Sequence, residues 1–307
     1  MSTAPIIAIT LLILAALQIA AYIIRRKRLA KKEVALEHIT GLVNDLHYLE
    51  AEEFTEALPP ADLKDADILY NLGYIKYNLN KIDKALNCFE SSVKLNRRSA
   101  QSHYSLGHIL FHNKEELKSA EFHLKKAIAL NKGYARAKST LGVLYYTMGQ
   151  YKKAEKLLFS AVTEEEQAPK AYNTLGLISF KRKEFGSAVS HFRQSILLDD
   201  KDTEVLVNLA NVHAMQMEYK DAEAVFLKAE ALKPSDKFIK YWLGSTLYLA
   251  KEYNKAGVKL TEAIKLDPEF AQGYLQRAFV YKKLGNREEY LKDYGKAITL
   301  NPKLKIN

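Results

Sequence analysis

The chain has 307 residues, of which 48% are hydrophobic types, and its net charge is +10. Residues 1–32 hold six basic and no acidic side chains, so only +4 is left for the other 275 residues. The larger part of the chain is therefore nearly neutral, and we expect no nucleic-acid partner. The single cysteine, Cys88, excludes a disulfide framework within one chain and fits a reducing compartment.

An uncharged apolar segment, IIAITLLILAALQIAAYII, covers residues 6–24. As a helix its 19 residues would extend about 28 Å, close to the roughly 30 Å hydrocarbon core of a bilayer. The basic residues that follow it directly are Arg25, Arg26, Lys27 and Arg28. A cleaved signal peptide carries its charges in front, with a small-residue cleavage site behind. We therefore predict an uncleaved transmembrane anchor in residues 1–32, with a cleaved, exported protein as the alternative.

The position of the basic cluster predicts the orientation of this anchor. Lys and Arg residues beside a membrane span stay on the cytoplasmic side. We expect a single-pass protein of the plasma (inner) membrane whose remaining chain lies in the cytoplasm. A mitochondrial outer-membrane protein that faces the cytosol is the alternative, since it also keeps basic residues just after its anchor.

The segment from 33 to 58 is expected to be helical. Its apolar stripe consists of Leu36, Ile39, Leu42, Val43, Leu46 and Leu49. Pro59 and Pro60 close the segment, and Asp62 or Asp65 could cap the next helix. We interpret residues 33–65 as a helical linker or degenerate capping repeat, and a coiled-coil stem is the alternative.

Residues 66–304 repeat themselves seven times with a period of 34 residues and one extra residue in the second unit. The units are 66–99, 100–134, 135–168, 169–202, 203–236, 237–270 and 271–304, which leaves 305–307 as a tail. A small residue stands eighth in every unit: Gly73, Gly107, Gly142, Gly176, Ala210, Gly244 and Ala278. Another recurs where a second helix would cross the first: Ala85, Ala120, Ala154, Ala188, Ala222 and Ala256. A fixed period in this range is typical of a solenoid of helix pairs.

This pattern resembles the tetratricopeptide repeat (TPR), whose skeleton is matched well by AYNTLGLISFKRKEFGSAVSHF at residues 171–192. The last unit departs from it, with Arg277 at position 7 and Tyr290 where a small residue is usual. The resemblance covers residues 66–304. It implies an all-α fold, a right-handed superhelical solenoid of about seven TPR helix pairs, here preceded by a single transmembrane helix.

The sequence shows no catalytic chemistry. It contains no G-x-S-x-G motif, no phosphate-binding Gly-rich loop and no dinucleotide fingerprint. His108 and His112 are four residues apart and could share a helical face, but no further ligands complete a metal site, and the other histidines are scattered. We expect no enzyme, no cofactor and no metal.

In the TPR family, the resemblance implies, the first helix of each pair lines a concave groove that receives peptide segments. The groove residues would stand at positions 2, 5, 9, 12 and 13 of the units. They are Tyr70, Tyr74, Tyr77, Tyr104, His108, Phe111, Arg136, Tyr146, Lys170, Asn173, Phe180, Lys181, Asn211, Phe238, Tyr241, Tyr248 and Leu249. Arg136, Lys170 and Lys181 would favour an acidic partner segment. The family's clamp for C-terminal carboxylates is disfavoured, because position 5 is never Lys.

These features predict a membrane-anchored scaffold or adaptor that recruits partner proteins through its TPR groove. The alternatives are an accessory or regulatory subunit of a membrane enzyme complex in envelope polysaccharide or peptidoglycan assembly, and a protein import or assembly receptor. The expected partners are other proteins or peptide segments, with the bilayer held through residues 6–24. The sequence is also compatible with a homo-oligomer.

Overall fold

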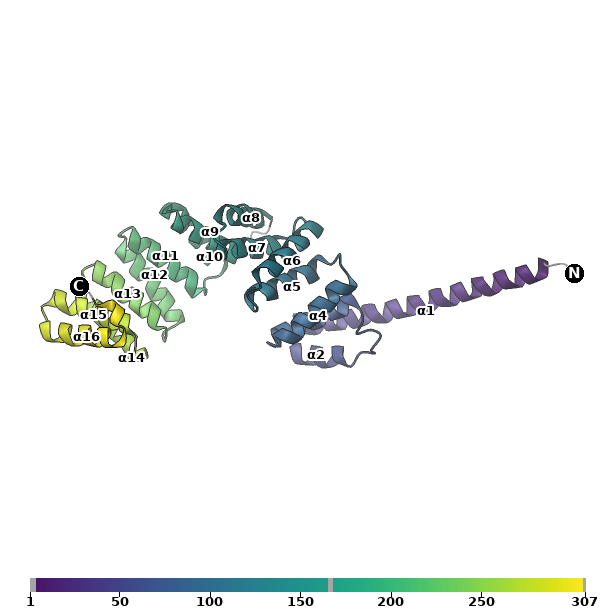
Figure 1. Cartoon of the computed structure of the whole chain (residues 1–307), viewed down its shortest axis with the longest axis horizontal. Helices are drawn as coiled ribbons and strands as arrows, with labels where there is room; N and C mark the ends of the chain where they lie inside the picture. Colours follow the sequence, from purple (N-terminus) through teal and green to yellow (C-terminus); the bar gives the residue numbers. More distant parts are fainter. Residues whose placement is uncertain (1–3, 165–167, 306–307) are drawn as a thin grey trace. The chain divides into compact units, whose positions relative to one another are not determined.

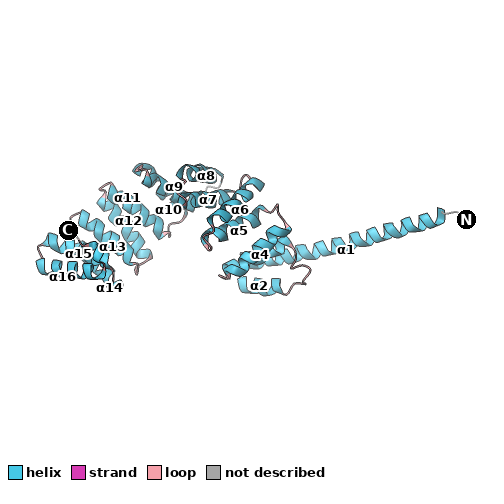
Figure 2. Ribbon diagram, viewed as in Figure 1, coloured by secondary structure: helices cyan, strands magenta, loops and turns pink. Residues whose placement is uncertain are grey.

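The computed structural model describes residues 4–164 and 168–305; the side chains of residues 4–16, Arg25 and Arg28 fall outside the description. Over this part of the chain it contains sixteen α-helices, one short 3-10 helix and no strand (Figures 1 and 2). The all-α prediction is confirmed. The first two helices are α1 (Ala4–Asn44) and α2 (Tyr48–Glu56), and the 3-10 helix is η1 (Pro302–Leu304).

The remaining helices form seven consecutive pairs. The first helices of the pairs are α3 (Ala66–Asn78), α5 (Ala100–His112), α7 (Ala135–Thr147), α9 (Pro169–Lys181), α11 (Thr203–Met215), α13 (Lys237–Leu249) and α15 (Ala271–Leu284). The second helices are α4 (Ile82–Leu95), α6 (Leu117–Leu130), α8 (Tyr151–Glu164), α10 (Phe185–Leu198), α12 (Tyr219–Leu232), α14 (Tyr253–Leu266) and α16 (Arg287–Leu300).

Local sequence signals explain where these helices begin and end. In four of the seven pairs, a side chain caps the N-terminus of the first helix by accepting hydrogen bonds from its backbone N–H groups. The capping residues are Asp65, Ser99, Asp202 and Asp236. The turn between the two helices of each pair contains one residue with a positive φ, which ends the first helix. These residues are Asn80, Glu115, Gly149, Lys183, Met217, Lys251 and Gly285.

The small residue at position 8 allows the two helices of a pair to pack closely. A Cβ added to Gly176 would lie 2.6 Å from Cε1 of Phe192 on the second helix. The same crowding, against Phe89, Leu124, Leu158 or Leu260, occurs at Gly73, Gly107, Gly142 and Gly244. The second recurring small residue is also fully buried, as in Ala188 and Ala222. The regular alternation of small and large residues is thus the packing rule of the pair.

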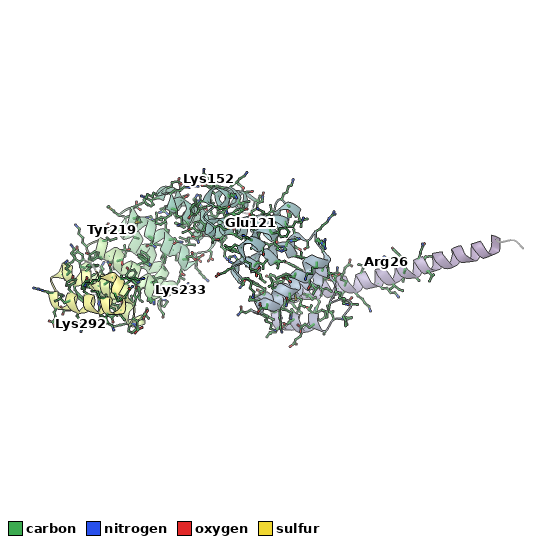
Figure 3. The ribbon with its side chains drawn as sticks, viewed as in Figure 1. Arg26, Glu121, Lys152, Tyr219, Lys233 and Lys292 are labelled. Atoms are coloured by element: carbon green, nitrogen blue, oxygen red, sulfur yellow. The ribbon has the colours of Figure 1, made fainter. Side chains whose placement is uncertain are left out.

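The pairs are divided between two compact units, the first ending at Ala137 and the second beginning at Lys138, inside α7. The core of the first unit includes Phe89, Ile109 and Leu124, all nearly or fully buried. In the second unit, Ala210, Phe226, Leu243, Leu260 and Val280 form one continuous buried cluster. Charged side chains such as Lys152, Lys233 and Lys292 cover the exposed surfaces (Figure 3).

The end of α1 and the whole of α2 pack against α3. Ile39, Leu42, Ala51 and Ile75 form a buried cluster among these helices. They cover the N-terminal side of the first repeat. The predicted apolar stripe is wrong at Leu46 and Leu49, which are exposed.

The reason is a turn that sequence periodicity did not reveal. Leu46 has a φ of 63°, which interrupts the helix between α1 and α2 and changes the direction of the chain. Lys32, the last residue of the predicted anchor region, binds Asp65 and Asp67 at the start of α3, at 2.9 and 2.8 Å.

The predicted anchor lies within α1. Among the described residues, no helix combines the length and the apolar character needed to cross a bilayer. Residues 6–16 of the expected span lie outside the described side chains, as do Arg25 and Arg28. Arg26 and Lys27 are exposed.

The last pair accommodates its two departures from the repeat pattern with polar and aromatic contacts. The guanidinium of Arg277 donates to Asp293 at 2.7 and 2.9 Å and to the Thr261 hydroxyl at 2.9 Å. Tyr290 stacks on Tyr294 with a centroid separation of 5.7 Å. The ion pair replaces the apolar contacts that position 7 makes in other repeats.

Candidate functional site

The first unit has a pocket of about 190 Å³ on the face formed by its first helices. Its walls come from α3, α5 and the start of α7, with one ring from α4: Tyr74, Tyr77, Phe89, Tyr104, Ser105, His108, Ile109 and Arg136. Five predicted groove residues therefore meet in one pocket: Tyr74, Tyr77, Tyr104, His108 and Arg136. We name it the aromatic pocket.

His108 lies at the centre of the ring contacts in the aromatic pocket. Its ring centroid is 5.8 Å from Tyr77 and 5.9 Å from Tyr104, and His112 stands 4.5 Å from it. Tyr70 lies nearby, where burial raises the pKa of its phenol and the charge of Arg136 acts in the opposite direction. The pocket thus combines aromatic walls with a guanidinium group. This combination suits an acidic side chain next to an apolar one.

The second unit has a larger pocket, of about 370 Å³, on the corresponding face. It is lined from α9, α10, α11 and α13 by Leu177, Phe180, Phe192, Asn208, Asn211, Ala214, Met215, Trp242, Ser245, Thr246 and Leu249. Phe180, Asn211 and Leu249 were predicted groove residues. Met215, Trp242 and Leu249 are 60, 42 and 52% exposed, although they are large and apolar. We name it the apolar pocket.

Polar groups are present in the apolar pocket as well. Asn208 donates a hydrogen bond from Nδ2 to Oδ1 of Asn173, at 3.3 Å. Burial raises the pKa of Tyr241, and Ser245 partly offsets that rise. No group among the described residues meets hydrogen-bond geometry with the buried Ser245 Oγ. Its lowering effect on the pKa of Tyr241 places this hydroxyl beside that phenol, inside the pocket wall.

The other predicted groove residues lie outside these pockets. Tyr146 packs on Tyr151, with Lys181 above the Tyr151 ring at 5.9 Å. Phe238 and Tyr241 both contact Phe270, at 5.6 and 5.2 Å.

Three further predicted residues stand apart. Tyr248 packs on Tyr253, and Lys170 is exposed. Phe111 is 9% exposed and belongs to the core, so little of its ring is open to a partner.

Sequence reasoning missed a whole position of the repeat. Ser105, Asn208 and Trp242 all stand sixth in their units, and all three line a pocket. Positions 2, 6, 9 and 13 follow the spacing of one helical face, so position 6 belongs with the others. The periodicity itself could have identified it.

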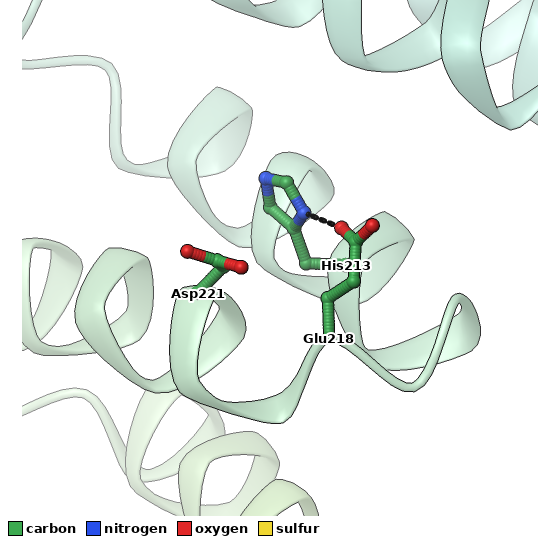
Figure 4. A group of neighbouring side chains, drawn as sticks. All are labelled: His213, Glu218 and Asp221. Atoms are coloured by element: carbon green, nitrogen blue, oxygen red, sulfur yellow. Dashed lines mark hydrogen bonds and ion pairs between the residues drawn. The ribbon is translucent and has the colours of Figure 1, made fainter.

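Two histidine contacts were also not expected. His103 and His123 join α5 to α6 with their Nδ1 atoms 2.9 Å apart, so the view that these histidines are scattered was wrong. Burial lowers the pKa of both, that of His123 to about 4. His213 lies beside Glu218 and Asp221 in the second unit (Figure 4).

Sequence comparisons match parts of the chain to one repeat family. Residues 114–178 match one model of the tetratricopeptide repeat, and residues 66–99 and 271–304 match another. Hsp70-Hsp90 organizing protein 1 of Glycine max is 44% identical over 59 residues, or 19% of this chain. The matched segment is 10% of that relative's own length.

Solved structures share the fold. The Cut9–Hcn1 hetero-tetramer of the APC/C gives a TM-score of 0.67 at 18% identity, over 79% of this chain and 48% of that one. YrrB, a TPR protein with an unusual peptide-binding site, gives a TM-score of 0.52 at 21% identity, over 60% of this chain and 95% of that one. Pseudomonas aeruginosa pilF gives a TM-score of 0.57 at 18% identity, over 66% of this chain and 92% of that one.

At such identities these structures show the fold alone. TPR repeats and their fold are typically non-catalytic modules for protein interaction. The chain is a helical solenoid that contains tetratricopeptide repeats, matched at residues 66–99, 114–178 and 271–304.

Proposed function

We propose that this chain is a membrane-tethered scaffold that holds segments of partner proteins against its first helices. The observation that carries the proposal is the apolar pocket, which leaves Trp242, Met215 and Leu249 exposed. Exposed apolar side chains gathered around a concavity are typical of interaction sites. Indole rings are also frequent anchors of binding energy at protein interfaces.

The chemistry of the two pockets suggests which segments they bind. The apolar pocket would take an aliphatic or aromatic side chain, while Asn208 and Asn211 hold the polar backbone around it. The aromatic pocket, with Arg136, would take an acidic residue. Binding of a peptide by YrrB, which shares the fold, supports the assignment to peptide segments.

The tether is supported by the sequence of α1. Residues 6–24 carry no charge, and Leu17, Ile19 and Ile24 are 61, 61 and 67% exposed. These side chains need an apolar environment that the described part of the chain does not provide. The basic residues that follow would hold the repeats on the cytoplasmic side. A tether raises the effective concentration of membrane-bound partners, so individual contacts can be weak.

Site-specific photocrosslinking in cells tests the binding face. We would place a photoreactive residue at position 242, in the apolar pocket, and separately at position 159. Phe159 is a matched control, since it is an aromatic residue on the second helix α8 and is 47% exposed. We expect partner adducts from 242 and none from 159. Equal adducts at both positions, or none at 242, would contradict the proposal.

A further inference from the structure

His213, Glu218 and Asp221 form a cluster at the turn between α11 and α12 (Figure 4). One potential ligand atom from each lies within 4.8 Å of those of the others. His213 is 5% exposed, and its Nδ1 is 2.5 Å from Oε2 of Glu218. Both carboxylates are exposed, so an ion could reach the cluster from solvent.

The corresponding turn of the next repeat shows what is unusual here. There the three positions hold Leu247, Glu252 and Lys255, and Lys255 pairs with Glu252 at 2.6 Å. In the fifth repeat Asp221 stands in place of the lysine. None of the described lysines or arginines forms an ion pair with Glu218 or Asp221.

The start of a helix explains only part of this arrangement. Acidic residues in the first turn interact favourably with the helix dipole, as Glu288 and Glu289 do in α16. That effect requires no imidazole, and the position equivalent to His213 in the last repeat is Tyr281. Two carboxylates that converge on a buried imidazole therefore need another reason.

We propose that His213, Glu218 and Asp221 bind a divalent transition metal ion of the Zn²⁺ type. One imidazole nitrogen and two carboxylate oxygens are donors that Zn²⁺ accepts, and water would complete the coordination. His213 and Asp221 also line a cavity of about 680 Å³, which gives room for that water. The ion would take the place of the His213–Glu218 hydrogen bond and join the end of α11 to the start of α12.

A calorimetric titration tests the site. Bound metal is first removed from the full chain with a chelator, and ZnCl₂ is then titrated into it in an isothermal calorimeter. Two variants introduce the residues of the sixth repeat: His213→Leu and Asp221→Lys. Since Asp221 is exposed and lysine stands there in the sixth repeat, Asp221→Lys keeps the fold, which circular dichroism verifies. The control variant removes two neighbouring histidines of the first unit, His108→Ala with His112→Ala.

We expect one Zn²⁺ per chain, with affinity lowered about tenfold or more by either His213→Leu or Asp221→Lys. The His108→Ala/His112→Ala variant should bind as the unaltered chain does. Zn²⁺ should also raise the thermal midpoint of the unaltered chain and leave that of Asp221→Lys unchanged. Absence of saturable heat, or equal affinity in Asp221→Lys, would overturn the site, as would loss of binding in the control alone.

Discussion

The glycine at position 8 of five repeats permits a helix separation that a side chain would prevent. Gly176 faces the fully buried ring of Phe192, and the ring atoms occupy the place of its missing Cβ. Repeats with alanine at this position, such as that of Ala210 opposite Phe226, show that one methyl group can be accommodated. A branched side chain demands a larger displacement.

We therefore predict that Gly176→Val destabilises the second unit by about 1–3 kcal/mol, the usual cost of overpacking a core. Gly295 is a matched control, because it is exposed within α16 and has no atom near its missing Cβ. Gly295→Ala should stabilise by about 1 kcal/mol, since alanine favours helices. Urea denaturation followed by circular dichroism measures both. A destabilisation by Gly176→Val no larger than the experimental error would contradict the packing rule.

Between elements, the imidazoles of His103 and His123 hold α5 against α6 only in their neutral form. Nε2 of His103 lies 3.3 Å from the Arg97 carbonyl and donates a hydrogen bond to it, so Nδ1 of His103 accepts a hydrogen bond from Nδ1–H of His123. Protonation of both rings would turn the two Nδ1–H groups toward each other. Burial lowers the pKa of both, and Lys126 adds to the effect on His103.

The sign of the pH dependence follows from these lowered pKa values. In the unfolded chain these histidines are protonated below about pH 6.5. In the folded chain His123 stays neutral until the pH falls to its lowered pKa of about 4. Stability contributed by the pair is therefore complete above pH 6.5 and lost as the pH falls toward 4. The double variant His103→Leu/His123→Val replaces both histidines by the residue types at the equivalent positions of the fifth repeat, where Leu206 and Val225 stand. It should lose less stability in urea denaturation between about pH 7 and pH 4.5 than the unaltered chain. An equal loss would show that the pair does not titrate as described.

The elements also show what the sequence could and could not predict. The helix pairs follow from small and large residues at fixed spacing, because each contact lies within one repeat, as between Gly176 and Phe192. Lys76 binds Glu52 and Glu56 from α2, at 3.0 and 2.5 Å, and no periodicity relates residues so far apart. For the candidate site, the predicted groove positions 2, 5, 9 and 12 supplied five residues that line the aromatic pocket. The apolar pocket needed position 6 and the relative rotation of three first helices, which only coordinates provide.

At the scale of the whole molecule, the proposed tether makes residues 6–24 a separate functional part. A lysine in the middle of a membrane-spanning helix costs about 2.5–3.5 kcal/mol. We predict that Ile13→Lys with Ala16→Lys removes the chain from lipid vesicles in a flotation assay. Val34→Lys is the control, since Val34 lies on the same helix beyond the basic cluster and is exposed. Flotation should survive this change. Equal flotation of all three proteins would contradict the tether.

A replacement of residues 6–24 by an unrelated apolar helix of equal length separates a tether from an accessory subunit of a membrane enzyme. A tether supplies only proximity, so both flotation and the photocrosslinked adducts at position 242 should be retained. A subunit that recognises its enzyme through the membrane would still float with vesicles but lose those adducts, because contacts between membrane helices depend on particular small and polar residues. We expect retention, because the exposed side chains of the apolar pocket lie on α11 and α13, far along the chain from α1. Loss of adducts with flotation intact would assign the specificity to the N-terminal helix instead.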